Sequence, residues 1–188
     1  MKEEKRQPGK FFENLMLVLK ISFITGTIVL ILRGFLFIPV QIEGYSMQST
    51  LHPNDRIVME RFSSIHRFDI VVLRLEDNET LVKRVIGLPN DEIAFQNGRL
   101  YVNGKEMKET FLSENLADYH SEVPYTNDFT LNDVIGKKRL GEEEYFVMGD
   151  NRLHSRDSRI FGVVTSEQIL GSALLIYSPL RDFRWLGN

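Results

Sequence analysis

The chain has 188 residues, of which 43% are hydrophobic and none is cysteine, and 23 Lys plus Arg stand against 26 Asp plus Glu for a formal charge of −3. A chain of this length buries a sufficient core without disulfides, which excludes a small stapled scaffold, and the missing cysteines exclude thiolate catalysis and cysteine-ligated zinc. The mildly acidic pI, near 5.9, argues against a general nucleic-acid binder.

The N-terminal part changes from charged to apolar along its length. Residues 1–14 include the basic residues Lys2, Lys5, Arg6 and Lys10, and residues 15–32 read LMLVLKISFITGTIVLIL, in which Lys20 is the one charge. About 20 mostly apolar residues span a bilayer as a helix, and this segment is apolar on every face. We therefore predict a basic cytoplasmic tail over 1–14 and a transmembrane anchor over 15–39.

Two alternatives to an anchor are a buried core helix and a cleavable signal peptide. Arg33 and bulky residues follow the apolar run, and no small-x-small cleavage site is found there, which favours an uncleaved anchor. The excess of Lys and Arg in the tail over the single Arg33 beyond the span predicts that the N-terminus stays inside. Residues 40–188 would then form the extracytoplasmic domain of a single-pass protein of the cell membrane.

The remainder of the chain has the pattern of a mainly β, antiparallel domain. Short runs rich in Val, Ile, Leu and aromatic residues predict strands over 55–60, 69–73, 80–86, 92–95, 99–102, 144–148 and 172–177. The pairs Asn97-Gly98 and Asn103-Gly104 each favour a two-residue hairpin turn. One helix is expected after the anchor, over 166–170, and the polar stretch 106–138 is expected to be a surface insertion.

Two segments carry residue types suited to nucleophilic catalysis. GYSMQSTL (44–51) places Ser46 in a glycine-containing turn, where it can be an exposed nucleophile or part of a serine-rich turn. In TLVKRVIGLPND (80–91), the period of two puts Lys83 on one strand face with Leu81 and Val85. An amine desolvated by apolar neighbours has a lowered pKa and can act as a base, whereas an edge-strand lysine in water cannot.

A third segment, MGDNRLHSRDSR (148–159), follows a predicted strand and is crowded with polar residues. It suits a hydrogen-bonded loop in which Asp157 pairs with an arginine and a hydroxyl reaches a neighbouring strand, and by itself it can also be purely structural. The four histidines show no metal-pair spacing and no triad setting. A serine can be activated by lysine instead.

In order, the anchor, GYSMQSTL, KRVIGLPND and GDNRLHSRDSR strongly resemble the bacterial type I signal peptidases, and the overall form is similar to that of the shorter Gram-positive members. These are membrane serine proteases with a Ser/Lys dyad. The resemblance implies that Ser46 is the nucleophile and Lys83 the general base. It implies that Ser155 orients the lysine, and it gives supporting roles to the remaining motif residues, which are Asp157, Arg159 and Arg84.

The same resemblance implies the substrates and partners. These are signal peptides of exported preproteins, cut after small residues at the −1 and −3 positions, together with the lipid bilayer. No metal, nucleotide or other cofactor is implied, and no nucleic acid. A self-cleaving repressor-type Ser/Lys protease shares related motifs, but it carries a DNA-binding domain where this chain has an anchor.

Four positions depart from the family pattern. Gly44 stands where some members carry a hydroxyl that donates to the oxyanion, so the Ser46 backbone N–H would carry more of that role. Ser49 replaces a proline, Phe68 the glycine of a GDIV box, and Asn90 the second glycine of a GLPGD turn. Gly44, Ser49 and Phe68 support an alternative: a catalytically weak or inactive membrane-anchored β-domain that binds or helps assemble exported proteins.

Overall fold

The computed structural model describes residues 8–112, 116–117 and 119–186, which divide into two compact units, 1–37 and 38–188. The first unit consists of helix α1 (Pro8–Leu36). A proline at the first helical position costs no hydrogen bond, because that N–H has no partner in the helix anyway. The tail residues Lys2, Lys5 and Arg6 lie outside the described residues.

Helix α1 is apolar on all sides. The stretch Lys10–Leu30 has a mean hydropathy of 1.6, and none of it is buried within the structure. By length and composition this helix could cross a membrane. The helix begins in the predicted tail and ends three residues before the end of the predicted anchor, because the chain becomes extended from residue 37.

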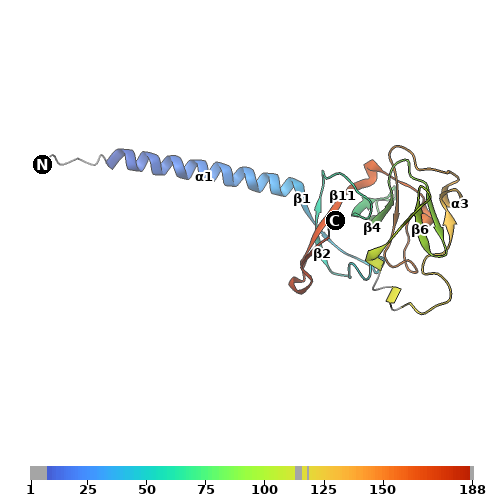
Figure 1. Ribbon diagram of the computed structural model, residues 1–188. Helices are drawn as coiled ribbons and strands as arrows, with labels where there is room; N and C mark the ends of the chain where they lie inside the picture. Colours follow the sequence, from blue (N-terminus) through green and yellow to red (C-terminus); the bar gives the residue numbers. More distant parts are fainter. Residues whose placement is uncertain (1–7, 113–115, 118, 187–188) are drawn as a thin grey trace. The chain divides into compact units, whose positions relative to one another are not determined.

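The second unit is built from two sheets (Figure 1). Each strand pair whose register is known runs antiparallel. The larger has the order β1-β2-β11-β3-β4-β9-β10, with β12 paired to β11, and the smaller has the order β7-β6-β5-β8. The larger sheet consists of β1 (Phe37–Gln41), β2 (Arg56–Glu60), β3 (Ile70–Arg74), β4 (Thr80–Gly87), β9 (Glu144–Met148), β10 (Val164–Thr165), β11 (Ile169–Ser178) and β12 (Arg184–Trp185). The smaller consists of β5 (Ile93–Gln96), β6 (Arg99–Val102), β7 (Lys105–Met107) and β8 (Phe129–Thr130). The mainly β fold predicted from the sequence is confirmed.

Both predicted hairpin turns are present. Asn97 and Gly98 connect β5 to β6 with φ angles of 51° and 72°, and Asn103 and Gly104 connect β6 to β7 with 51° and 78°. Successive positive φ angles are what a two-residue turn needs to match the strand twist. Asn90, in the turn after β4, also has a positive φ of 68°, which Asn tolerates better than most residues.

The helix predicted over 166–170 is wrong. A 3₁₀ turn, η2 (Ser166–Gln168), is followed at once by β11, in which Ile169 pairs with Leu73 of β3. The capping signal at Thr165 opens a turn as expected, but sheet pairing ends it. Gly171 does not stop a helix: it lies inside β11, where an added Cβ would lie 2.3 Å from the Glu60 carbonyl oxygen.

Two short helices were not predicted. Helix α3 (Leu131–Ile135) has a capping box in which Thr130 and Asp133 bond reciprocally, and it ends at Gly136 with a φ of 69°. Helix α4 (Ser158–Phe161) is capped by Asp157. Helix α3 lies in the stretch 106–138, which also supplies 3₁₀ turn η1 (Thr110–Leu112), strand β8 and three buried residues, namely Leu112, Thr126 and Leu131. This stretch is therefore part of the core as well as of the surface.

Candidate active site

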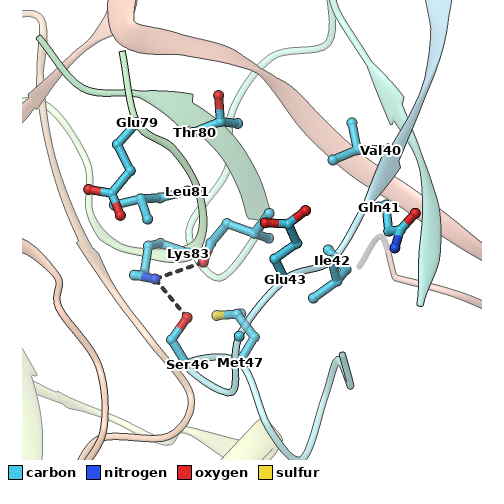
Figure 2. Close-up of a pocket in the computed structure, with 12 residues that line it drawn as sticks. Val40, Gln41, Ile42, Glu43, Ser46, Met47, Glu79, Thr80, Leu81 and Lys83 are labelled. Carbon is cyan, nitrogen blue, oxygen red and sulfur yellow. Dashed lines mark hydrogen bonds between the residues drawn. The ribbon is translucent and has the colours of Figure 1, made fainter. Parts of the chain in front are cut away.

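Ser46 and Lys83 lie in direct contact. The Lys83 Nζ donates to Ser46 Oγ at 2.8 Å and to the Val82 carbonyl oxygen at 3.1 Å (Figure 2). Lys83 comes from β4, and Ser46 comes from the turn region after β1. The fold thus joins two residues that are separated by 37 positions in the sequence.

Lys83 is buried among apolar side chains, with a relative exposure of 2%. Its neighbours on the same strand face, Leu81 and Val85, pack in one apolar cluster with Val71, the cross-strand partner of Lys83 on β3. Burial lowers the pKa of Lys83 from 10.5 to about 8, because the charged amine loses its hydration. The nearby carboxylate of Asp157 acts against this shift without cancelling it.

The turn that carries Ser46 is fixed from two sides. Met47 and Leu51 are buried in the core, and the amides of Thr50 and Leu51 both donate to the Met47 carbonyl oxygen, at 2.9 and 2.8 Å. From the other side, the Asn151 amide donates to the Ser46 carbonyl oxygen at 3.1 Å. The turn is therefore held by hydrogen bonds and packing with a serine, not a proline, at position 49.

Gly44 lies two residues before the nucleophile candidate with a φ of +78°, and no atom lies within 4 Å of the place where its Cβ would be. The space is open, but the backbone conformation is one that L-residues adopt at a cost. A serine here would be strained. The absence of a side-chain hydroxyl at this position thus agrees with the local backbone.

Asp157 organises the loop behind the Ser46–Lys83 pair. Its carboxylate accepts from Arg159 Nε and Nη2, both at 2.8 Å, and from the Gly149 amide at 3.0 Å. Burial alone would raise the pKa of Asp157, but the hydrogen bonds and charge of Arg159 outweigh it, so the pKa lies below its ordinary value. The predicted pairing of Asp157 with an arginine is present, and the Ser158 hydroxyl reaches strand β9 by accepting from the Val147 amide at 2.9 Å.

Among the described residues, Lys83 donates no hydrogen bond to Ser155, and the orienting role that the resemblance implies for Ser155 stays a prediction. The Ser155 Oγ is buried and interacts with the Asp157 carboxylate, whose pKa it helps to lower, and Lys83 Nζ is engaged by Ser46 and Val82. Ser155 packs instead against Gly149, where an added Cβ would lie 2.2 Å from Ser155 Oγ and 2.4 Å from the Ser46 carbonyl oxygen. The glycine lets this hydroxyl and the Ser46 backbone approach the same point of the loop.

Arg84 lies on the face of β4 opposite to Lys83. Its Nε and Nη2 donate to the two Asp150 carboxylate oxygens at 2.8 and 2.7 Å, and its Nη1 donates to the Phe68 carbonyl oxygen at 2.7 Å. Phe68 has a φ of +74°, the conformation for which glycine is preferred, and its ring contacts the Phe111 ring with centroids 5.3 Å apart. The guanidinium of Arg84 lies 4.0 Å above that same Phe111 ring. Phe68 thus combines the glycine-like backbone with packing that a glycine cannot supply.

A second buried ion pair behind the loop is not predicted by the sequence. Arg152 donates to Glu109, to Thr126 Oγ1 at 2.9 Å and to the Gly149 carbonyl oxygen at 2.9 Å. Its side chain is fully buried. Arginine in the polar loop was visible in the sequence, but its partner lies 43 residues away in the stretch 106–138, and no local pattern indicates that contact.

A cleft of about 540 Å³ adjoins the Ser46–Lys83 pair. One wall consists of residues 40–44 with Ser46 and Met47, and the other of residues 79–83 (Figure 2). Strand β9 pairs with β4 only between Arg84 and Gly87, so the earlier half of β4 has β3 on one side and the cleft on the other. The cleft therefore offers backbone groups of β4 along its length.

The model of the family described as signal peptidase, peptidase S26 matches residues 15–178. The chain belongs to this family. The match includes most of α1 and all three motif segments, 44–51, 80–91 and 148–159. Membership makes the chain a protease, and relatives named signal peptidase I imply a serine peptidase.

Similar proteins are found among curated sequences and solved structures. The signal peptidase I of Bacillus caldolyticus is 42% identical over 86% of this chain and 90% of its own length, and a signal peptidase I of Bacillus amyloliquefaciens is 37% identical over 98% of both. The crystal structure of a signal peptidase I from Enterococcus faecalis V583 aligns with a TM-score of 0.57 at 34% identity, over 59% of this chain and 97% of that one.

Proposed function

We propose that this family member is a membrane-anchored serine endopeptidase that removes N-terminal signal peptides from exported preproteins, with Ser46 as nucleophile and Lys83 as general base. The observation that carries the proposal is the 2.8 Å contact between Nζ of the buried Lys83 and Ser46 Oγ at the cleft. A base works best when its pKa lies near the operating pH, and about 8 meets that condition.

The proposed reaction uses one base twice. Neutral Lys83 accepts the proton of Ser46 Oγ, which attacks the scissile carbonyl carbon, and the protonated amine then gives its proton to the leaving nitrogen. The resulting ester is cleaved by a water that Lys83 deprotonates, which returns Ser46 to its starting state. The Ser46 backbone N–H, which donates no hydrogen bond to any described residue, supports a role as oxyanion donor.

The shape of the cleft supports an extended peptide as substrate. The free side of residues 80–83 lets a peptide pair with β4 by strand addition, and side chains of such a peptide alternate between the floor and the opening. The floor is apolar, with Ile42, Met47 and Val82 in one cluster. An apolar floor suits small apolar residues at alternate positions, as in the −1 and −3 pattern of the proposed substrates.

Helix α1 supports anchoring in the lipid bilayer. We propose that the N-terminus is cytoplasmic and that residues 40–188 form the extracytoplasmic catalytic domain, because Lys and Arg are concentrated before the span. Anchoring holds the catalytic domain at the same membrane as a membrane-inserted signal peptide, which raises the effective concentration of each for the other.

The test is cleavage of a preprotein with a small-x-small site by the full-length protein in detergent micelles. Ser46→Ala and Lys83→Ala are each expected to lower kcat/KM by at least about 10³-fold, as loss of a nucleophile or its base does in serine proteases. Lys105→Ala removes an exposed lysine on β7 and serves as the matched control, with unchanged activity.

The same assay separates the binding-module alternative. Lys83→Met keeps an unbranched side chain in the apolar site and is expected to bind the preprotein without cutting it. If the unaltered protein also binds the preprotein and never cuts it, the chain is a binding relative and the proposal is refuted.

A further inference from the structure

One wall of the cleft carries a carboxylate that the proposed chemistry does not use. Glu43 lines the cleft three residues before Ser46 and is exposed. Figure 2 shows its side chain extending toward strand β4 across the cleft. No ion pair or side-chain hydrogen bond joins Glu43 to another residue in the described ranges.

The other carboxylate at the cleft is already paired. Glu79, on the opposite wall, accepts from Arg156 of the polar loop, which also lies 3.8 Å from Asp77. The negative charge of Glu79 is therefore paired with the positive charge of Arg156. Lys83 is the one cation among the residues that line the described cleft, and it is bonded to Ser46. Glu43 thus leaves the opening of the cleft with an uncompensated negative charge.

Buried and exposed side chains alternate along this wall, and this alternation determines which substrate side chains lie near the Glu43 carboxylate. Ile42 is buried in the apolar floor, whereas Gln41 and Glu43 are exposed. In a peptide paired with β4, successive side chains point alternately to the floor and to the opening of the cleft, where Glu43 is exposed. If small residues at −1 and −3 face the floor, the side chains at −2 and −4 lie on the face of Glu43.

We infer that Glu43 is a specificity-determining residue, which favours signal peptides with Lys or Arg at −2 or −4 and disfavours those with Asp or Glu there. The inference rests on the proposed function and adds a charge preference to it. Both partners are exposed to solvent, so the contribution is modest and falls with salt. We expect a ratio of about fivefold in kcat/KM between Lys and Glu substrates at low ionic strength.

The experiment uses the full-length protein in a neutral detergent and three peptides that differ only at −2 and −4, where they carry Lys, Ala or Glu around constant small residues at −1 and −3. The unaltered protein is expected to cleave the Lys peptide fastest and the Glu peptide slowest, with the ratio approaching one in about 1 M salt. Glu43→Gln is expected to bring the ratio between the Lys and Glu peptides close to one, and Glu43→Lys to invert it.

Glu142→Gln provides the matched control, because Glu142 is exposed and lies outside the cleft. It is expected to keep the full preference. Equal cleavage of all three peptides by the unaltered protein, or a preference that Glu43→Gln leaves intact, overturns the inference while the proposed function stands. If the Ala peptide is not cleaved at all, the proposed function fails and the inference fails with it.

Discussion

Replacing Lys83 by methionine should abolish activity and make the protein more stable near neutral pH. A lysine with a pKa of about 8 when folded and 10.5 when unfolded binds a proton more weakly in the folded state. At pH 7 this difference costs the folded state about 3 kcal/mol, since each pKa unit corresponds to about 1.4 kcal/mol. The cost is fully present below pH 8 and is relieved between pH 8 and 10.5, so at pH 10 less than about 1 kcal/mol remains.

Methionine preserves the unbranched shape and removes the charge, but the hydrogen bond to Ser46 is lost at a cost of about 1 kcal/mol. The net gain in unfolding free energy is therefore about 2 kcal/mol at pH 7 and close to zero at pH 10. For a protein of this size that gain raises Tm by about 4–8 °C at pH 7.

Thermal unfolding in detergent micelles, followed by the fluorescence of the single tryptophan, Trp185 on β12, measures this effect in the second unit. Lys105→Met changes an exposed lysine and should leave Tm within about 2 °C at both pH values. A Lys83→Met protein whose Tm is unchanged or lower at pH 7, or raised equally at pH 10, would refute the argument that a buried, desolvated amine destabilises the fold.

Three further outcomes are expected. The rate of cleavage at low substrate concentration should rise about tenfold per pH unit below pH 8 and level off above it, because only neutral Lys83 accepts a proton; a flat profile from pH 6 to 9 would contradict this. Gly149→Ala should lower kcat by more than about tenfold, since its Cβ would overlap Ser155 Oγ and the Ser46 carbonyl oxygen; wild-type kcat would show that the loop adapts freely. Asp150→Ala should lower the unfolding free energy by about 3–5 kcal/mol in denaturant titrations, because it leaves the Arg84 charge buried and unpaired; a loss below about 1 kcal/mol would show that solvent reaches that arginine.

Local patterns predict much of the fold. Strand alternation and the two Asn-Gly pairs suffice for the hairpins, because turn geometry depends on the residues in the turn itself. The helix predicted over 166–170 was wrong because the capping signal at Thr165 is local, whereas the pairing of Ile169 with Leu73 that overrides it is not.

The candidate site was predictable only in part from the residues. The strand pattern around Lys83 indicates an apolar setting, but nothing in either segment indicates that Ser46 lies beside it; that pairing came from the order of three motifs and the family they resemble. The Arg152–Glu109 pair and the position of Ser155 depend on how the loop packs against distant segments. Such contacts are fixed by the tertiary structure and have no signature at short range.

The register of strand β4 has a consequence for how the chain can vary. Lys83 lies opposite Val71 and Arg84 opposite Ile70, and neighbouring residues point to opposite faces. A slip of one residue in one direction would present to Ser46 the guanidinium of Arg84, which stays protonated. A slip in the other direction would present Val82 to Ser46 and place the amine of Lys83 against Asp150. The turn at residues 75–79, closed by the Leu75 amide donating to the Glu79 carbonyl oxygen at 2.9 Å, therefore has a length that the chemistry fixes. A single insertion or deletion there would therefore move the titratable amine away from Ser46.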